Sequence, residues 1–394
     1  MSIVLLDFSA KFIYVLQWFI LYNCVIFSQA GNWHKDKAVI YIAHVRPAQH
    51  KIALAMPAIY VCILYDLILQ KYIVPCFFRL SATKGMVVNM FETHNPDIEK
   101  EIIKLKKERD AVIVAHNYQN DEVQDIADAV GDSFYLSKFC AASPHQVIVF
   151  CGVRFMAESA KILSPHKTVL LPESQAGCPL ADSITANDVQ RLKAEHPGAV
   201  TICYINSSAE VKAESDICCT SSNAVRVVRS VPEKDVIFIP DKNLGNFVQK
   251  HVPEKNLILY DGCCVTHNRF GLREFEAARA QYPDAPVAVH PECSPEVVEN
   301  ADFVGSTSQI IDFCKKNDAK RFVIGTEMGV LRTLKSDNPE KQFYLLTPRL
   351  VCSNMKLTTL NSVVRSLREM RFDINVAEDV RLRAVTCLER MLSF

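Results

Sequence analysis

The strongest constraint on the fold of this chain is an internal repeat of 86–88 residues. Three apolar, strand-like runs lead into His116, Tyr204 and His290, which are 88 and 86 residues apart. Nearly the same intervals separate three hydroxyl residues and the starts of three further apolar runs: Ser133, Ser221 and Thr307, and residues 147, 236 and 322. This period is longer than the roughly 20–50 residues of solenoid repeats. It therefore predicts three copies of a small domain.

Within the first copy, strand-like and helix-like patterns alternate. DAVIVAHNYQ at 110–119 is an apolar run, and NDEVQDIADAV at 120–130 has apolar residues at helical spacing. VIVFCGV at 147–153 is the next strand-like run. This order implies a parallel sheet with helices on both faces. We therefore predict an α/β fold of three similar three-layer α/β/α domains around a pseudo-threefold axis. The expected domains are 86–185, 186–275 and 276–394, the last with additional C-terminal helices.

The first 85 residues have a different composition, because they contain no Glu and are rich in apolar residues. The apolar run at 12–27 is shorter than the roughly 20 residues that span a bilayer. The second run, 52–78, is interrupted by Asp66 and Lys71, and charges are costly in lipid. We interpret residues 1–85 as an extension with no role in the core function. A membrane anchor and an accessory domain are the alternatives.

The overall charge is balanced, with 44 basic and 44 acidic residues, so nothing indicates the basic face that binds nucleic acid. The chain has 15 cysteines, an odd number, in a protein too large to be a small disulfide scaffold. Such a cysteine content indicates a reducing compartment, where some thiols are buried and others bind metal. We expect a cytoplasmic protein.

Three cysteines recur at the spacing of the repeat. Cys178 in AGCPLAD, Cys264 in DGCCVTH and Cys352 in VCSNMK are separated by 86 and 88 residues. Around a pseudo-threefold axis, equivalent thiolates would converge on one point. Three thiolates suit a Zn site completed by water or His, or a [4Fe–4S] cluster with one iron open to substrate. The simpler alternative is that each is a buried core cysteine.

Several long blocks resemble the quinolinate synthase family of bacterial de novo NAD biosynthesis: AHNYQNDEVQDIADAVGDS, LPESQAGCPLAD, YINSSAEVKAESDICCTSSNAV, HPECSPEV and ADFVGSTSQII. The resemblance runs from about Asn95 to Phe394 and does not include residues 1–85. It implies the condensation of iminoaspartate with dihydroxyacetone phosphate to quinolinate, with loss of phosphate and two waters. It also implies three similar α/β/α domains, and an aspartate oxidase or dehydrogenase as the supplier of iminoaspartate.

The resemblance further implies a [4Fe–4S] cluster held by one cysteine per domain, at Cys178, Cys264 and Cys352. By motif, the family's catalytic residues correspond to His116, Tyr118, His267, His290 and Glu292. Its substrate-binding residues correspond to His116, Ser133, Tyr204, Asn206, Ser221, His290, Glu292, Ser306 and Thr307.

The chemistry explains these residue types. Losing phosphate and water requires a Lewis acid, which an open iron can supply, and proton carriers that work near neutral pH. All the catalytic residues except His267 are expected at the C-terminal ends of strands, where open parallel sheets bind ligands. Ser133, Ser221 and Thr307 are each expected to begin a helix. Their hydroxyl and free backbone N–H groups could then hold anionic substrates.

Two rival functions remain: a non-catalytic metal-binding protein on the same fold, and a Zn-dependent lyase that uses the same thiols. Glu327 is expected either near the metal group or as a structural carboxylate. Lys356 is expected to be solvated, although it could aid anion binding. Cys263 and Cys219 are interpreted as ordinary neighbours of the motif residues.

Overall fold

The computed structural model describes four stretches of the chain, the first three by backbone alone: residues 2–4, 25–27, 40–43 and 96–394. The chain divides into two compact units, Met1–Met90 and Phe91–Phe394. The described strands of the first unit pair antiparallel in the order β1-β3-β2: Ser2–Val4 (β1), Val25–Phe27 (β2) and Ile40–Ala43 (β3). Most of the predicted extension, residues 1–85, lies outside the described residues. Within those described, no helix is long and apolar enough to cross a membrane.

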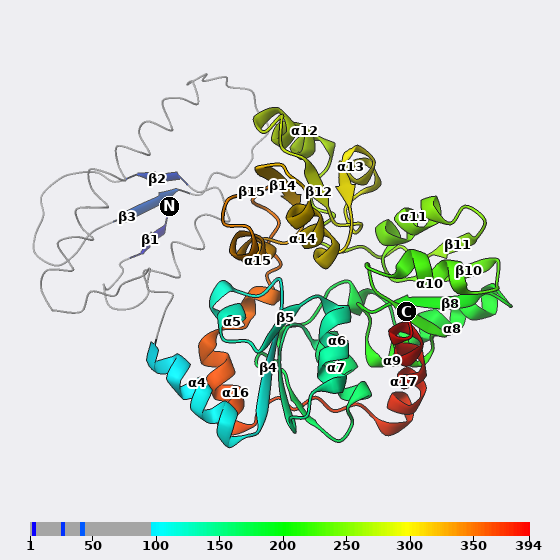
Figure 1. Cartoon of the computed structure of the whole chain (residues 1–394), viewed down its shortest axis with the longest axis horizontal. Helices are drawn as coiled ribbons and strands as arrows, with labels where there is room; N and C mark the ends of the chain where they lie inside the picture. Colours follow the sequence, from blue (N-terminus) through cyan, green and yellow to red (C-terminus); the bar gives the residue numbers. More distant parts are fainter. Residues whose placement is uncertain (1, 5–24, 28–39, 44–95) are drawn as a thin grey trace, which may run out of the picture. The chain divides into compact units, whose positions relative to one another are not determined.

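Helices and strands alternate along the second unit in the same order three times (Figure 1). The first domain contains α4 (Pro96–Glu108), β4 (Ala111–His116), α5 (Asp121–Asp125), β5 (Ala129–Gly131), α6 (Ser133–Ala142), β6 (Val147–Cys151), α7 (Arg154–Leu163) and β7 (Thr168–Leu170). The second contains α8 (Ala186–Glu195), β8 (Val200–Tyr204), α9 (Ala209–Ala213), β9 (Ile217–Cys219), α10 (Ala224–Ser230), β10 (Asp235–Ile239), α11 (Lys242–His251) and β11 (Asn256–Leu259). The third contains α12 (Leu272–Gln281), β12 (Val287–Val289), α13 (Pro295–Asn300), β13 (Phe303–Val304), α14 (Thr307–Lys316), β14 (Arg321–Gly325), α15 (Val330–Asp337) and β15 (Gln342–Leu345).

Each domain forms a four-stranded parallel sheet of identical topology, in the orders β5-β4-β6-β7, β9-β8-β10-β11 and β13-β12-β14-β15. The predicted α/β class and the threefold repeat are therefore confirmed. The domain boundary expected between residues 275 and 276 falls inside α12. The helix expected over 120–130 was wrong in its second half, because α5 ends at Asp125 and residues 129–131 form the short strand β5.

The first sheet shows why these strands form. Its central strands are buried on both faces, as parallel strands covered by helices require. Ile113 and Val149 belong to a core cluster with residues of α4 and α16, whereas Val114 and Phe150 pack with residues of α6 and α7. Figure 1 shows these two helix pairs on opposite sides of β4. Successive strand residues thus face different helix layers, which fixes the register of the sheet.

A repeated aspartate fixes the start of the first strand in each domain. The carboxylates of Asp128, Asp216 and Asp302 accept hydrogen bonds from the backbone N–H groups of Ile113, Thr201 and Val287 at 2.8, 2.8 and 2.7 Å. Each aspartate also pairs with a cation: Lys106, Lys193 and Arg279 respectively. These contacts satisfy backbone groups at the edge of the sheet where the strands begin.

A repeated lysine closes the end of a helix at the same edge. Lys167, Lys255 and Lys341, spaced by 88 and 86 residues, each donate to carbonyls at or just after the last turn of α6, α10 or α14. Lys341, for example, lies 2.7 Å from the carbonyl of Cys314 and 2.9 Å from that of Asn317. A cation at this position satisfies free carbonyls and matches the negative end of the helix dipole.

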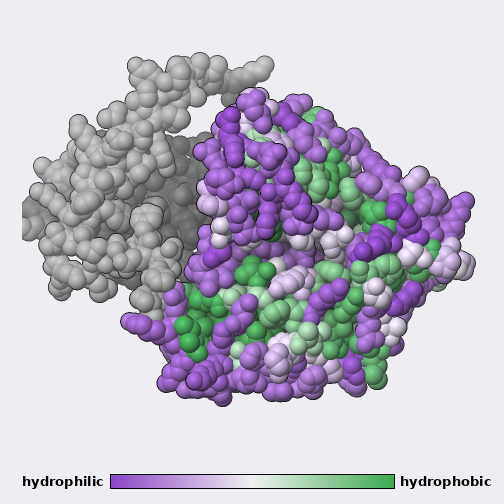
Figure 2. Space-filling view, viewed as in Figure 1, coloured by the Kyte–Doolittle hydropathy of each residue, from purple (hydrophilic) through white to green (hydrophobic). Residues whose placement is uncertain are grey.

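The C-terminal helices return to the first two domains. Helix α16 (Leu360–Glu369) packs on α4 and β6 of the first domain. Helix α17 (Glu378–Leu392) packs on α9 and β9 of the second domain and also contacts α7 of the first. The end of the chain therefore ties the first two domains together. In the face shown in Figure 2, hydrophilic residues dominate over the third domain, and hydrophobic residues gather over the first.

Candidate active site

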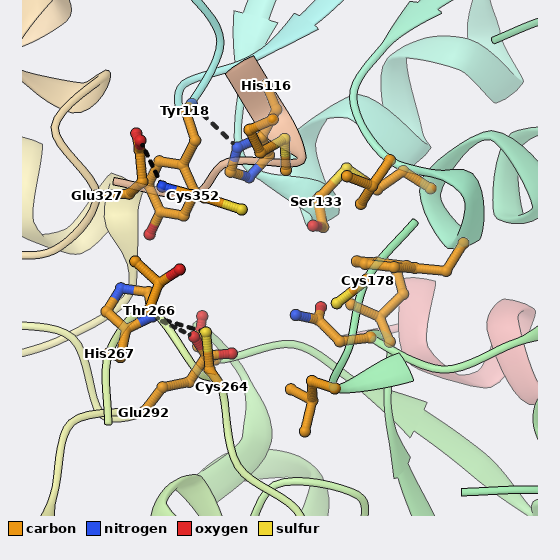
Figure 3. Close-up of a pocket in the computed structure, with 18 of the residues that line it drawn as sticks. His116, Tyr118, Ser133, Cys178, Cys264, Thr266, His267, Glu292, Glu327 and Cys352 are labelled. Carbon is orange, nitrogen blue, oxygen red and sulfur yellow. Dashed lines mark hydrogen bonds and ion pairs between the residues drawn. The ribbon is translucent and has the colours of Figure 1, made fainter. Parts of the chain in front are cut away.

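One pocket lies where the C-terminal ends of the strands of all three domains meet (Figure 3). Thirteen of the fourteen predicted site residues line it: His116, Tyr118, Ser133, Cys178, Tyr204, Asn206, Ser221, Cys264, His267, His290, Glu292, Thr307 and Cys352. Ser306 is the exception. Its hydroxyl accepts a hydrogen bond from the backbone N–H of Gln309 and caps α14. Equivalent positions of three repeats thus share one pocket, as a pseudo-threefold axis requires.

The three cysteines each follow the last strand of their domain, and Figure 3 shows their sulfur atoms directed into the pocket. Burial, with smaller contributions from the nearby Cys352 and Glu292, raises the pKa of the Cys178 thiol to about 12. Burial likewise raises the pKa of Cys264, with added contributions from Glu292 and Cys178. Cys263 is half-buried and does not line the pocket. Without a bound cation, these sulfurs are therefore neutral thiols.

Backbone N–H groups face each of the three sulfurs from the residues that follow. Those of Ala181 and Leu180 act to lower the pKa of Cys178, and that of His267 does so for Cys264. The sulfur of Cys352 meets the N–H groups of Met355 and Asn354 in the same way. Donors aimed at a sulfur stabilise the thiolate, which is the form that binds metal.

Two histidines occupy equivalent places in the first and third domains. Nδ1 of His116 accepts a hydrogen bond from the backbone N–H of Tyr118 at 3.1 Å, and Nδ1 of His290 accepts one from that of Glu292 at 3.3 Å. Burial lowers the pKa of both histidines to about 3. At neutral pH both rings are therefore neutral and carry their proton on Nε2. For His290 this atom lies 3.2 Å from the Ser221 hydroxyl.

A chain of hydrogen bonds crosses the pocket wall from Tyr118 to Glu292. The Tyr118 hydroxyl lies 2.6 Å from Thr326 Oγ1, which lies 2.9 Å from His267 Nε2. His267 Nδ1 lies 2.7 Å from Glu292 Oε2 and 3.2 Å from the Cys264 sulfur. A second hydroxyl, that of Thr307, is 2.7 Å from Tyr118. The chain is a continuous route for protons. Thr326, which links Tyr118 to His267, was missed by sequence reasoning because the other two repeats have no hydroxyl at the equivalent position.

The two ends of this chain have opposite acid–base character. Burial and the nearby Glu292 raise the pKa of Tyr118 well above its ordinary value, so Tyr118 keeps its proton. Burial acts to raise the pKa of Glu292, but His290, His267 and Tyr204 together lower it below its ordinary value. Glu292 Oε1 is buried and has no hydrogen-bond partner among the described residues. A donor from a bound ligand would satisfy it.

The predicted anion site is only partly built from helix starts. Ser133 and Thr307 are the first residues of α6 and α14. The expectation for Ser221 was wrong, because α10 begins at Ala224 after its N-cap residue Asn223. The three-residue strand β9 ends at Cys219, and a turn separates it from the helix. Ser221 therefore contributes its hydroxyl, which contacts His290, and no helix terminus.

Two buried carboxylates hold the backbone of pocket cysteines, and one of them, Glu327, also lines the pocket. Asp241 accepts from the backbone N–H of Cys264, and Glu327 accepts from that of Cys352. Sequence reasoning considered Glu327 and missed Asp241. The two are 86 residues apart, so the repeat itself was the signal that could have found the pair. Lys356 is less solvated than expected, because its ammonium group pairs with Glu327 at 3.2 Å.

Cys264, His267 and Glu292 also form a group that could hold a metal ion, since their ligand atoms all lie within 4.8 Å of one another. His267 and Glu292 are already joined by a hydrogen bond, however, and both ring nitrogens of His267 belong to the proton chain. A metal at this place would break that chain. Cys178, Cys264 and Cys352 could together bind a metal group and leave this hydrogen-bond chain intact.

Fold and pocket together define a class: an α/β enzyme whose site is assembled from three repeated domains. Within this class the chain belongs to the family of quinolinate synthetase A proteins, since the family model matches residues 100–393. It is 60% identical over 295 residues to a quinolinate synthase of Caldicellulosiruptor bescii, covering 75% of this chain and 97% of the relative. Those of Clostridium kluyveri and Geobacter metallireducens are 57% and 53% identical, again over 97% of their own lengths and 74% and 75% of this chain.

Proposed function

We propose that this chain condenses iminoaspartate with dihydroxyacetone phosphate to quinolinate, with loss of phosphate and two waters, as a step of NAD biosynthesis. The observation that carries this proposal is the meeting of thirteen motif residues from three domains in one pocket. Relatives named quinolinate synthase are matched over nearly their whole length, which supports the same activity here.

We further propose that Cys178, Cys264 and Cys352 hold a [4Fe–4S] cluster. The donor set fits: three sulfurs from three domains face one pocket, and backbone N–H groups stabilise each thiolate. Soft thiolates select iron–sulfur clusters or zinc over hard cations. When bound, a cluster with one iron free of cysteine would supply a Lewis acid for a substrate oxygen.

The chain's own groups bind the anionic substrates without a positive side chain in the pocket wall. Among the described residues that line the pocket, none is Lys or Arg. His116 and His290 instead present neutral Nε2–H donors, and Asn206 and the hydroxyls of Ser133 and Ser221 add further polar contacts. Neutral donors orient carboxylate and phosphate groups without trapping the anionic product by charge.

Glu292 and Tyr118 divide the proton transfers in this proposal. The ionised Glu292, with Oε1 free of other partners, accepts a proton from the substrate. Tyr118 keeps its proton and can donate it to a departing or tautomerising oxygen. His267 and Thr326 connect the two, so a proton taken at one end can be returned at the other. Groups whose pKa values are pushed apart are suited to separate acid and base roles.

The test of this division compares Glu292→Gln and Tyr118→Phe with the native chain. Each variant is expected to lose about 10²–10⁴-fold in kcat for quinolinate formation, the usual contribution of a general acid or base. Iron content should stay unchanged, because neither residue is an assigned ligand. Tyr344→Phe is the matched control, since Tyr344 bonds to Gln342 on β15, away from the pocket. Native turnover in an iron-replete Glu292→Gln variant would contradict the assignment.

The choice between iron and zinc needs a direct measurement. Protein purified without oxygen is expected to contain about four iron and four sulfide per chain and little zinc, as a cubane cluster requires. Zinc in stoichiometric amount with full activity would instead favour a zinc-dependent lyase. An active protein free of iron would contradict the proposal of an iron–sulfur cluster.

We also place the reaction in the cytoplasm, with an aspartate oxidase or dehydrogenase supplying iminoaspartate. The 12 cysteines of residues 96–394 are all free thiols, which supports a reducing compartment.

A further inference from the structure

We propose that Asp241 and Glu327 are positioning residues that hold Cys264 and Cys352 in place for the metal group. Their role rests on the proposed function, in which these cysteines are ligands. Neither carboxylate was assigned a catalytic, substrate-binding or metal-binding role from the sequence. Both act through the backbone N–H of a cysteine, and Glu327, although it lines the pocket, uses both of its oxygens on backbone N–H groups.

Asp241 is fully buried and uses both carboxylate oxygens. Oδ2 accepts from the backbone N–H of Cys264 at 3.0 Å, and Oδ1 accepts from that of Leu244 at 2.8 Å, which caps α11. The same residue pairs with Gly262 in an isolated parallel bridge. A side chain at Gly262 would lie 2.4 Å from the carbonyl of Pro240, so the two segments are packed as closely as backbone allows. The Cys264 loop is thus clamped to the start of α11.

Glu327 repeats this arrangement in the third domain. It is fully buried, its Oε1 accepts from the backbone N–H of Cys352 at 3.1 Å, and its Oε2 accepts from that of Gly329 at 2.7 Å. A side chain at Gly329 would lie 2.6 Å from the carbonyl of Asn117, in the loop that carries Tyr118. The Cys352 loop is thus held at a close contact between the third and first domains (Figure 3).

The two carboxylates are equivalent by fold as well as by sequence. Asp241 lies two residues after the end of β10, and Glu327 two residues after the end of β14. The first domain has Val153 at the same place, two residues after β6. A valine offers no acceptor, so Cys178 is the internal reference: a proposed ligand without a carboxylate behind it.

Glu327 carries one additional connection. The Lys356 ammonium group pairs with it at 3.2 Å and donates to the carbonyl of Tyr118 at 2.7 Å. The Cys352 loop is therefore joined through Glu327 and Lys356 to the loop of a catalytic residue. Weakening the hydrogen bonds of Glu327 should therefore lower both the turnover per bound iron and the retention of iron. Loosening Asp241 should mainly lower iron retention.

We call each carboxylate, with its hydrogen bonds to a cysteine N–H and to a second backbone N–H, a clamp. Replacing the carboxylate by an amide tests the clamp and changes the shape of the side chain little. Each carboxylate receives an N–H group on both oxygens, and an amide has only one acceptor oxygen. In Asp241→Asn or Glu327→Gln one backbone N–H must therefore face an NH₂ group. Changing the partner of a metal ligand typically costs 10–100-fold in metal affinity. We expect iron to be released to a chelator roughly 10–100-fold faster from each variant than from the native chain.

The experiment uses the full chain with its iron loaded in the absence of oxygen, and follows iron transfer to an excess of chelator. Asp302→Asn is the matched control. Asp302 also accepts a backbone N–H, that of Val287 at 2.7 Å, but at the opposite edge of the sheet. Its iron release should stay within about twofold of the native rate. Thermal unfolding of the metal-free proteins, measured alongside, reports whether each variant folds.

Asp241→Ser separates the clamp from the helix cap. Serine at an N-cap still accepts from the N–H three residues on, here Leu244, but its short side chain cannot also reach Cys264. Faster iron release from Asp241→Ser with native thermal unfolding supports the clamp even if Asp241→Asn folds poorly.

Two other outcomes count against different steps. Native release rates in Asp241→Ser and Glu327→Gln, with iron lost from Cys264→Ser and Cys352→Ser, would overturn the positioning role and leave the ligand assignment standing. Iron retained by the two cysteine variants would overturn the ligand assignment, and with it the clamp.

Discussion

The two edges of the three parallel sheets differ in how strictly the repeat is kept. Where the strands begin, all three domains use the same residue type for the same contact: Asp128, Asp216 and Asp302, and Lys167, Lys255 and Lys341. Where the strands end, equivalent positions differ: His116, Tyr204 and His290; Tyr118, Asn206 and Glu292; Val153, Asp241 and Glu327. Among the repeated residues that line the pocket, only the cysteines are identical in all three domains, while Ser133, Ser221 and Thr307 share a hydroxyl.

This difference follows from what each edge has to do. Every domain must satisfy the same backbone groups at the start of its strands and at the end of its helices, so one residue type serves three times. The pocket is a single asymmetric site, and the reaction proposed for it needs a proton donor, a proton acceptor and neutral anion-binding groups from different domains. The cysteines remain identical because a metal group would require the same bond from each domain.

The largest effect is expected from changing the cysteines, which are identical in all three domains. Replacing Cys178, Cys264 or Cys352 by Ser should abolish iron retention in each case, because a serine oxygen is a poor ligand for a site that selects soft thiolates. Quinolinate formation should be lost with the iron. Iron and sulfide per chain, measured after purification without oxygen, provide the check.

Cys263→Ser is the control for this series. Cys263 neighbours Cys264 but does not line the pocket, so its variant should keep native iron and activity. Equal iron loss in all four variants would mean that the cysteines act through folding and that the pocket sulfurs are not special.

A smaller effect is expected at the other edge. Lys167 is buried and donates to the carbonyls of Cys140 and Ser143, so Lys167→Met leaves helix-end carbonyls without their partner. The free energy of unfolding should fall by about 1–3 kcal/mol, the cost of leaving a buried polar group unsatisfied. Iron per folded chain should not change. Chemical denaturation and iron analysis of the same samples measure both quantities.

The exposed Lys335 supplies the control, as Lys335→Met, and should alter stability by less than about 0.5 kcal/mol. If Lys167→Met were to lose iron without losing stability, the proposed separation between the two edges would be wrong.

The same contrast explains what the sequence could predict. The repeat was visible because Cys178, Cys264 and Cys352 keep one chemistry at one spacing, and it pointed to Cys264, not Cys263, as the residue of the pocket. The alternation of strand and helix gave the fold class, since central strands such as β4 and β6 are continuous apolar runs.

The features that escaped prediction share a different cause. The strands β5, β9 and β13 have only two or three residues, too few to show a period, so β5 was absorbed into an expected helix. Asp241 was missed because its partner is a backbone N–H, which leaves no mark on the partner's residue type. The packing of α17 on the second domain depends on contacts between residues far apart in sequence.

The pH dependence of stability provides a third comparison. A moderate effect is expected from the two buried histidines of the pocket, His116 and His290. The pKa of His116 and His290 is about 3 in the folded chain, against about 6.5 for an unperturbed histidine. Between these values the unfolded chain binds protons that the folded chain does not. Stability is therefore fully present above about pH 6.5 and falls as the pH is lowered, by up to about 1.4 kcal/mol per pH unit for each histidine.

His116→Asn should reduce this slope, because the asparagine oxygen can still accept from the Tyr118 N–H but does not titrate. Urea denaturation at pH 7.5, 6 and 5 measures the slope, with His251→Asn on the exposed end of α11 as the control. An unchanged slope in His116→Asn would mean that His116 takes up its proton in the folded chain and cannot act as the neutral donor proposed here.

The smallest effect is expected from removing residues 1–85, which lie outside the family match. The family match begins at residue 100, and the described residues that line the pocket all lie between His116 and Met355. A chain that starts at Met86 should therefore form quinolinate with a kcat and an iron content within about twofold of the full chain. Steady-state assays and iron analysis of the two proteins side by side make the comparison. Loss of iron or of cooperative unfolding in the shorter chain would show that the first 85 residues support the α/β domains, and the division of labour would then extend beyond the two edges of the sheets.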